Sequence, residues 1–112
     1  MKFRIFLFFT LLSTNVCANG YLSNGPDSTI KWINLEPTVI RIAFDSPTKR
    51  NPDSCGSVGA VLMKQESDYE KAMYSSLLAA MHSGKKVKFY GAGCLSGWGT
   101  TYPKVKAVYI YN

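Results

Sequence analysis

Two aromatic residues, Trp98 and Tyr102, lie in a glycine-rich segment that reads GAGCLSGWGTTYP. A flat aromatic ring can cover the apolar C–H face of a sugar, while nearby hydroxyl or backbone groups bond its polar rim. The same segment supplies three hydroxyls, from Ser96, Thr100 and Thr101. We interpret the segment as a candidate glycan-binding surface. The alternative is that the two rings cap one end of the folded core, because loop position alone does not decide between the two roles.

The titratable residues suggest no catalytic set. His82 is the only histidine, and it falls near the end of an expected helix, where its charge would interact favourably with the helix dipole. The seven acidic residues are scattered, and several occupy turns or the helix start, where such residues are common. Because no nucleophile–base pair can be assigned, we expect no enzyme. A hydrolase whose two carboxylates meet only in space is the alternative.

The first 18 residues, MKFRIFLFFTLLSTNVCA, follow the pattern of a signal peptide. A basic start precedes a short apolar core and a small-residue cleavage site that ends at Ala18. A lipoprotein signal needs a small residue before its cysteine, whereas Val16 precedes Cys17 here, so we expect ordinary cleavage. The mature chain, residues 19–112, is then a single secreted or periplasmic domain with no transmembrane segment.

Two cysteines remain after that cleavage, Cys55 and Cys94. In an oxidising compartment such a pair indicates one disulfide, and only one pairing exists. The bridge closes a loop of about forty residues and contributes roughly 3–4 kcal/mol in the chain-entropy model. Two cysteines and one histidine do not make a tetrahedral ligand set, so we expect neither a metal nor another cofactor.

The charge of the chain is mildly basic. The formal net charge of +6 includes Lys2 and Arg4, which leave with the signal peptide, so the mature chain carries 6 − 2 = +4. Basic residues cluster at Lys49–Arg50 and again between Lys85 and Lys88. Such clusters attract anionic glycans, lipid head groups or nucleic acid, or they form an ordinary solvated surface. Export disfavours nucleic acid as the partner.

One helix and five strands are expected to position these residues. Ser67 and Glu70 form a capping box at the helix start, and Gly84 supplies a left-handed stop. Apolar residues recur at helical spacing between them, at Tyr69, Ala72, Met73, Tyr74, Leu77, Leu78, Ala80 and Met81. This face is expected to lie against a sheet or to line an interface.

Alternating apolar residues predict the strands Thr29–Leu35, Val39–Phe44, Ala60–Lys64, Lys86–Tyr90 and Lys104–Tyr111. The alternation places Ile30 and Trp32 on one face of the first strand. Residues 19–28 and 91–103 are expected to be loops. The order β-β-β-α-β-β is that of an OB-fold, a small five-stranded and partly open barrel in the mainly β (α+β) class. An open α+β sheet with one covering helix is the alternative.

The chain resembles the B subunits of bacterial A-B toxins that have a pentameric binding ring. The resemblance lies in a helix that ends in SGKKVKFY, a following WGTTYP and a last strand. Within this family it is most similar to the B subunits of subtilase cytotoxin and typhoid toxin. The resemblance implies an OB barrel, a homopentamer with helices lining the pore, binding to host glycans that end in sialic acid, and a separate catalytic A subunit.

The resemblance also implies two site residues. In the family, a serine just ahead of the first strand contacts sialic acid, and Ser28 is the matching position. A tyrosine at the end of the strand after the helix also contributes, and Tyr90 is the nearest match, offset by one residue. The chain is shorter than the family's usual members. The alternative function is a stand-alone secreted or periplasmic protein-binding domain of the same fold, without a toxin partner.

Overall fold

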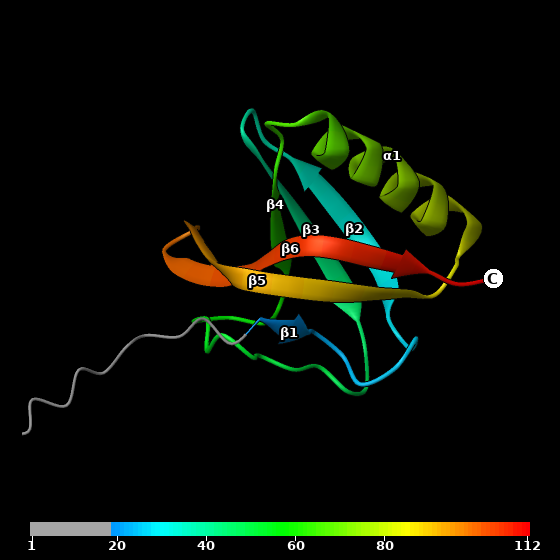
Figure 1. Ribbon diagram of the computed structural model, residues 1–112, viewed down its shortest axis with the longest axis horizontal. Helices are drawn as coiled ribbons and strands as arrows, with labels where there is room; N and C mark the ends of the chain where they lie inside the picture. Colours follow the sequence, from blue (N-terminus) through cyan, green and yellow to red (C-terminus); the bar gives the residue numbers. More distant parts are fainter. Residues whose placement is uncertain (1–18) are drawn as a thin grey trace, which may run out of the picture.

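The structure, a computed structural model, describes residues 19–112; the predicted signal peptide lies outside the described residues. Six strands and one helix follow one another along this part of the chain (Figure 1). Their bounds are β1 (Gly20–Tyr21), β2 (Thr29–Leu35), β3 (Val39–Asp45), β4 (Val61–Lys64), α1 (Asp68–Ser83), β5 (Val87–Gly97) and β6 (Thr100–Ile110). The expectation of a mainly β domain with one helix between the strands is confirmed. The strand β1 is an addition, because two residues are too few to show an alternating pattern.

The strands β2 to β6 pair with one another in the order found in an OB barrel. The sheet order is β1-β5-β6-β4-β3-β2, and the pair β4–β6 is parallel, with Leu62 opposite Lys104. Ser28, just before β2, forms an isolated bridge with Val87 at the start of β5. The Val87 N–H donates to the Ser28 carbonyl at 2.8 Å. This contact joins the first and last members of the five-stranded order, which makes a partly open barrel.

The helix α1 begins and ends where the sequence predicts. Ser67 caps it, since the Glu70 N–H donates to the Ser67 Oγ at 3.2 Å and the Ser67 N–H donates to the Glu70 Oε1 at 3.1 Å. Gly84 ends it with a φ of 66°, the left-handed conformation that glycine adopts most readily. The helix lies across one side of the barrel (Figure 1). Only part of its predicted apolar face is buried, because Tyr69 stays 60% exposed.

The core fills the barrel between β3, β5 and the inner face of α1. Alternate residues of β3 point inward, and the Phe44 ring packs on the Phe89 ring with centroids 5.2 Å apart. The fully or nearly fully buried members include Leu22, Ile40, Ile42, Val61, Met63, Met73, Leu77, Val87, Phe89 and Val105. The inner face of α1 therefore closes the barrel with aliphatic side chains and brings no polar chemistry to its interior.

A bulge in β2 changes which way Trp32 points. The register shifts between Ile30 and Trp32, and one extra residue reverses the alternation of side chains beyond it. Ile30 and Ile33 therefore both pack against the core, whereas Trp32 lies opposite Ala43 and is 42% exposed. The expectation that Ile30 and Trp32 share a face is wrong for this reason.

Residues 91–103 form a hairpin rather than the expected loop. The strands β5 and β6 continue through this segment and stay paired from Val87–Ile110 down to Gly97–Thr100. The register shifts twice around Gly91, and Gly93 has a φ of 78°. Glycines at bulges let a strand bend without leaving the sheet. The same glycines make the sequence read as a loop, so the predicted end of one strand at Tyr90 is too early and the predicted start of the next at Lys104 is too late.

The predicted disulfide between Cys55 and Cys94 is confirmed. It spans 39 residues and ties the loop after β3 to β5 beyond the bulge. Hydrogen bonds reinforce the same junction, since the Gly93 N–H donates to the Asp53 Oδ2 at 2.8 Å and the Gly56 N–H donates to the Thr101 Oγ1 at 2.7 Å. The loop and the hairpin are thus fixed to each other by both covalent and polar contacts.

Removing the disulfide with the pair Cys55→Ala and Cys94→Ala is expected to lower the free energy of unfolding by about 3–4 kcal/mol, because the unfolded chain regains the freedom of a long loop. Urea titration followed by circular dichroism measures the loss. Reducing the unaltered protein should reproduce it, and a reductant should leave the double variant unchanged. Equal urea midpoints for the oxidised protein and the double variant would contradict this account.

Candidate functional site

The tip of the β5–β6 hairpin is a two-residue turn made of Trp98 and Gly99. Gly97 and Thr100 pair across it, and the two turn residues have φ values of 48° and 78°. A hairpin turn of this kind matches the twist of the strands but needs positive φ at both positions. Glycine adopts that conformation freely, whereas a bulky side chain is an outlier there. Trp98 is therefore held in a strained conformation while 43% of it is exposed.

Arg41 of β3 lies against the face of the Trp98 ring. Its guanidinium carbon is 4.0 Å from the Trp98 centroid and 5.1 Å from the Trp32 centroid. Guanidinium groups are attracted to indole faces at such distances. Trp32 reaches the outer face only because of the bulge in β2. The two tryptophans of the chain thus meet at one arginine, although they lie far apart in the sequence.

The predicted pair Trp98 and Tyr102 does come together. Their ring centroids are 6.3 Å apart with an edge-on angle of 82°, an arrangement that aromatic pairs favour. The hairpin tip also rests on β4, because the Leu62 side chain, fully buried, lies 3.5 Å from where a Cβ at Gly97 would stand. The pair therefore covers the outer side of the β3–β4 sheet rather than an end of the barrel. We refer to Trp32, Arg41, Trp98 and Tyr102 as the tip cluster.

An open groove of about 400 Å³ runs beside Trp98, between the hairpin tip and the β2–β3 turn. Its wall includes a carboxylate and two hydroxyls, from Glu36, Thr38 and Ser96. Such groups can bond sugar hydroxyls while the indole covers an apolar face. The groove and the tip cluster together therefore offer both kinds of contact that a sugar needs.

Ser28 and Tyr90, the residues carried over from the toxin resemblance, lie elsewhere. Ser28 is fully buried at the barrel closure, and its Oγ has no hydrogen-bond partner in the described part of the chain. Tyr90 is half-buried in β5 opposite Ala107, several residue pairs away from the turn at Trp98. The structure therefore separates Ser28 and Tyr90 from Trp98 and Tyr102, and the glycan contacts of all four residues remain predictions.

Tyr90 belongs to a second aromatic group on the sheet of β1, β5 and β6. Its ring centroid is 5.2 Å from that of Tyr21, which in turn is 5.9 Å from that of Tyr109. The Lys88 Nζ lies 4.0 Å from the Tyr21 centroid. A side-chain hydrogen bond with Tyr21 raises the pKa of Tyr109 above 10.0. Tyr109 therefore stays a neutral hydroxyl at neutral pH.

Sequence reasoning found only half of the tip cluster. It singled out Trp98 and Tyr102 because they stand close together in an unusual segment. It missed Trp32 and Arg41 as site residues, because their meeting depends on a bulge and on the pairing of β2 with β3. One signal was present: Arg41 is the single charged residue within the apolar run VIRIAF, on the face away from the core.

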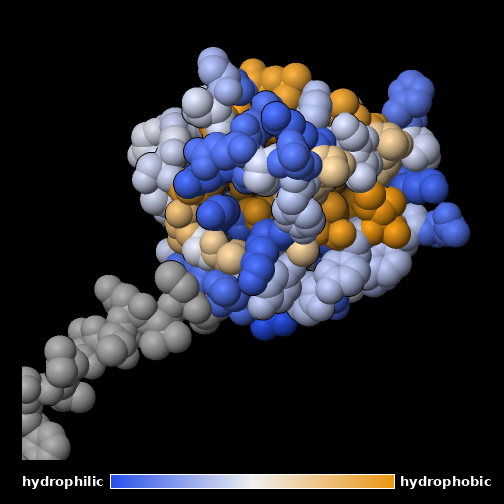
Figure 2. Space-filling model, turned by 45° about the horizontal axis from the view of Figure 1, so that its top comes forward, coloured by the Kyte–Doolittle hydropathy of each residue, from blue (hydrophilic) through white to orange (hydrophobic). Residues whose placement is uncertain are grey.

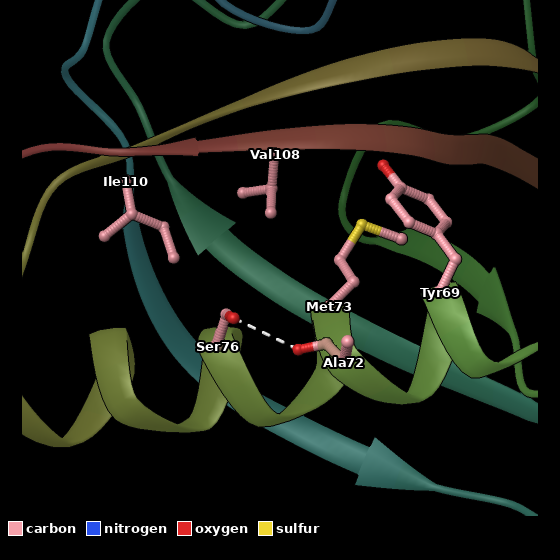
Figure 3. Close-up of a pocket in the computed structure, with 6 residues that line it drawn as sticks. All are labelled: Tyr69, Ala72, Met73, Ser76, Val108 and Ile110. Carbon is pink, nitrogen blue, oxygen red and sulfur yellow. Dashed lines mark hydrogen bonds between the residues drawn. The ribbon is translucent and has the colours of Figure 1, made fainter.

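A further groove lies between α1 and β6. It has a volume of about 330 Å³ and is lined by Tyr69, Ala72, Met73, Ser76, Val108 and Ile110, with the helix side chains pointing toward the strand (Figure 3). With the top of Figure 1 turned forward, the surface shows hydrophobic residues among hydrophilic ones (Figure 2). The groove shares no lining residue with the one beside Trp98. Its apolar character suits a contact surface better than chemistry on a polar substrate.

Comparison with known proteins gives no relative, since no family model, curated protein or solved structure matches the chain significantly. Within residues 19–112, no helix has both the length and the apolar character needed to cross a membrane. The same residues contain no cluster of three or more histidine, cysteine or acidic side chains that could hold a metal ion. The functional argument therefore rests on the geometry of the tip cluster and on the resemblance described above.

Asp27 holds the loop ahead of Ser28. The Thr48 Oγ1 donates to the Asp27 Oδ2 at 2.5 Å, and the Ser46 Oγ donates to its Oδ1 at 2.8 Å. These hydrogen bonds, that of Thr48 first, lower the pKa of Asp27 below its ordinary value of 3.8. Hydrogen bonds to the charged carboxylate favour ionisation, so the ionised side chain fastens this loop to the one after β3.

The lowered pKa of Asp27 predicts acid sensitivity. Because the folded pKa lies below the unfolded one, ionised Asp27 stabilises the fold above 3.8, and this contribution is lost as the pH falls through the folded pKa. We expect Asp27→Asn to destabilise the protein at about pH 6 but to have little effect at about pH 2, as measured by urea midpoints. The exposed carboxylate of Glu66 provides the control, because it makes no ion pair or hydrogen bond among residues 19–112, and Glu66→Gln should show a smaller difference between the two pH values. An Asp27→Asn effect independent of pH would contradict the assignment.

The strain at Trp98 predicts an unusual response to substitution. Replacing a large aromatic residue in a core typically costs 3–5 kcal/mol. For Trp98→Asn we expect a change of less than about 1 kcal/mol in the free energy of unfolding, because Asn-Gly is the favoured pair for this turn and offsets the lost contact with Arg41. Urea titration measures the change, with Phe89→Ala as the core comparison. A loss as large as that of Phe89→Ala would show that Trp98 serves the fold.

Proposed function

We propose that this protein is a secreted glycan-binding protein, similar to the B subunits of bacterial A-B toxins, that binds host cell-surface glycans ending in sialic acid as a homopentamer. The observation that carries the proposal is Trp98, a large exposed aromatic residue held in a strained turn over Arg41. Strained residues cluster at binding sites, where the surrounding structure maintains a conformation that the isolated chain would avoid. A turn selected for stability alone would favour asparagine or glycine at this position.

The surroundings of Trp98 suit a sugar. The indole is exposed and rigid, since Arg41 packs on its face and Tyr102 on its edge. The adjoining groove adds the polar side chains of Glu36, Thr38 and Ser96. An aromatic platform next to convergent polar groups is the usual construction of a site for a partly apolar, partly hydroxylated ligand. The Tyr90 group offers hydroxyls and Lys88 on the β1–β5–β6 sheet, and we keep it as the family-derived part of the proposal.

Self-association would raise the overall avidity of such open sites for a surface that carries many glycans. A single shallow site binds weakly, whereas several sites that act together gain avidity without any new contact. Exposed apolar residues on α1 and β6, among them Tyr69 and Ile110, support a contact between copies. The disulfide supports an oxidising compartment such as the periplasm or the exterior. The proposal includes a separate catalytic A subunit and gives this chain no catalytic role.

The second candidate function is a stand-alone secreted or periplasmic protein-binding domain of the same fold. The groove between α1 and β6 favours it, because that groove is apolar and lies apart from the tip cluster. An apolar segment of a partner protein would be its occupant. The two functions differ in where substitutions act, since Tyr69 lines the groove and Trp98 lines the sugar surface.

Two measurements on the mature, oxidised protein test the leading proposal. Light scattering after size exclusion should give a mass near five chains. On a glycan array, the unaltered protein should bind sialylated glycans, and Trp98→Asn should lower that binding about fivefold, since stacking on one aromatic residue is worth about 1 kcal/mol. The mass and the melting curve of the variant should stay unchanged.

Matched variants separate the possible causes. Ser28→Ala and Tyr90→Phe test the positions carried over from the toxin family, and a loss with these alone would move the site to the Tyr90 group. Tyr69→Ser should alter the mass without changing the affinity of a single site. A monomer that binds no glycan would refute the proposal and leave the protein-binding alternative.

A further inference from the structure

Arg41 has no partner of opposite charge among residues 19–112. The ion pair found among residues 19–112 joins Lys31 to Asp45, and the hydrogen bonds of the described side chains include none to Arg41. Its Nε is buried and without a hydrogen-bond partner. A buried N–H group that remains unpaired costs free energy, so each such group in a folded protein calls for an explanation. The guanidinium therefore keeps its capacity to donate hydrogen bonds, and its terminal groups can offer that capacity to a ligand.

The neighbour of Arg41 across the strands shows the same deficit. Asn34 of β2 lies opposite Arg41 of β3 in the strand register. The Asn34 Oδ1 is also buried and has no hydrogen-bond partner among residues 19–112. The described region contains four such atoms, and two of them lie in this one residue pair. Unmet hydrogen-bonding capacity is therefore concentrated beside the tip cluster.

The two indoles decide how a ligand can approach Arg41. The guanidinium carbon lies 4.0 Å from the Trp98 centroid and 5.1 Å from the Trp32 centroid, so both indoles adjoin the charged group. Among the Arg41 nitrogens, Nε is the one found buried without a partner within residues 19–112, so the terminal Nη groups keep contact with solvent. The terminal nitrogens of a guanidinium match the paired oxygens of a carboxylate or a sulfate.

We propose that Arg41 binds the oxyanion of an acidic sugar whose apolar face lies on Trp98, and that it selects acidic over neutral glycans. The inference rests on the proposed glycan-binding function and names the residue that gives it charge specificity. Charge-assisted hydrogen bonds from a guanidinium are stronger than neutral ones, and the neighbouring indoles limit competition by water. The mature charge of +4 obtained above assists the approach of an anion at long range.

Intrinsic fluorescence is a site-specific probe here, because both tryptophans of the chain flank Arg41. Three related probes share a lactose core and differ at its 3′ position: lactose is neutral there, lactose 3′-sulfate carries a sulfate, and 3′-sialyllactose carries an acidic sugar. We expect the unaltered protein to bind at least one acidic probe about tenfold more tightly than lactose. Arg41→Gln should lower the affinity for that acidic probe to the affinity for lactose. Arg41→Lys should restore part of the difference in affinity, because lysine keeps the positive charge but lacks the two-pronged guanidinium group.

Arg50→Gln is the matched control, because it removes an equal charge from an exposed loop position outside the tip cluster. It should leave the preference for acidic probes intact, and melting curves verify that each variant is folded. If the unaltered protein binds lactose and both acidic probes equally, the inference about Arg41 is wrong while glycan binding stands. If Arg41→Gln weakens lactose as much as the acidic probes, Arg41 merely supports Trp98 and the inference is again wrong. If no probe and no array glycan binds, the proposed function fails together with it.

Discussion

The structure depends on one constraint: the β5–β6 hairpin must take part in both sides of the barrel. At the end of the hairpin farthest from its turn, the Val87 N–H donates to the carbonyl of Ser28, just ahead of β2, and this hydrogen bond closes the barrel. Farther along, β6 pairs with β4 through Lys104. The register shifts at Gly91 allow one hairpin to do both, since bulges bend and twist a strand without ending it. The disulfide at Cys94 then fixes the outer half to the loop after β3. The position of Trp98 follows from this bent and tethered hairpin.

Local rules were enough for part of this fold. The capping box at Ser67 and the stop at Gly84 each act on a few neighbouring residues at one end of the helix, so the bounds of α1 could be read from the sequence. The succession of β2, β3, β4, α1, β5 and β6 along the chain followed from the alternating segments on either side of the helix. What could not be read was the continuation of the hairpin through residues 91–103. Its glycines satisfy a long-range requirement, closure of the barrel, and the same residues are equally typical of a loop.

The candidate site was likewise predictable only where it depends on residues close in sequence. Trp98 and Tyr102 are close in sequence, and their meeting needs only a hairpin. Arg41 reaches them through the stacking of β3 beneath the hairpin tip, and Trp32 through a bulge that reverses the alternation of β2. A single extra residue in a strand leaves no signature in composition or periodicity. The half of the cluster that came from local spacing was predictable, and the half that came from register was not.

Two independent departures from an ideal fold meet at the tip cluster. Trp98 occupies a turn position that favours glycine or asparagine, and the adjacent pair Asn34 and Arg41 leaves buried polar atoms unpaired. A purely structural role would explain the first only if stacking on Arg41 outweighed the strain, yet cation–π contacts at exposed sites are worth about 0.5–1 kcal/mol and strain of this kind costs 1–3 kcal/mol. Stacking also leaves the charge of Arg41 without a counter-ion in the described part of the chain. A ligand that covers the indole and accepts hydrogen bonds from the guanidinium accounts both for the strained tryptophan and for an arginine that has no partner of opposite charge among residues 19–112. Binding is therefore the more economical explanation of this surface.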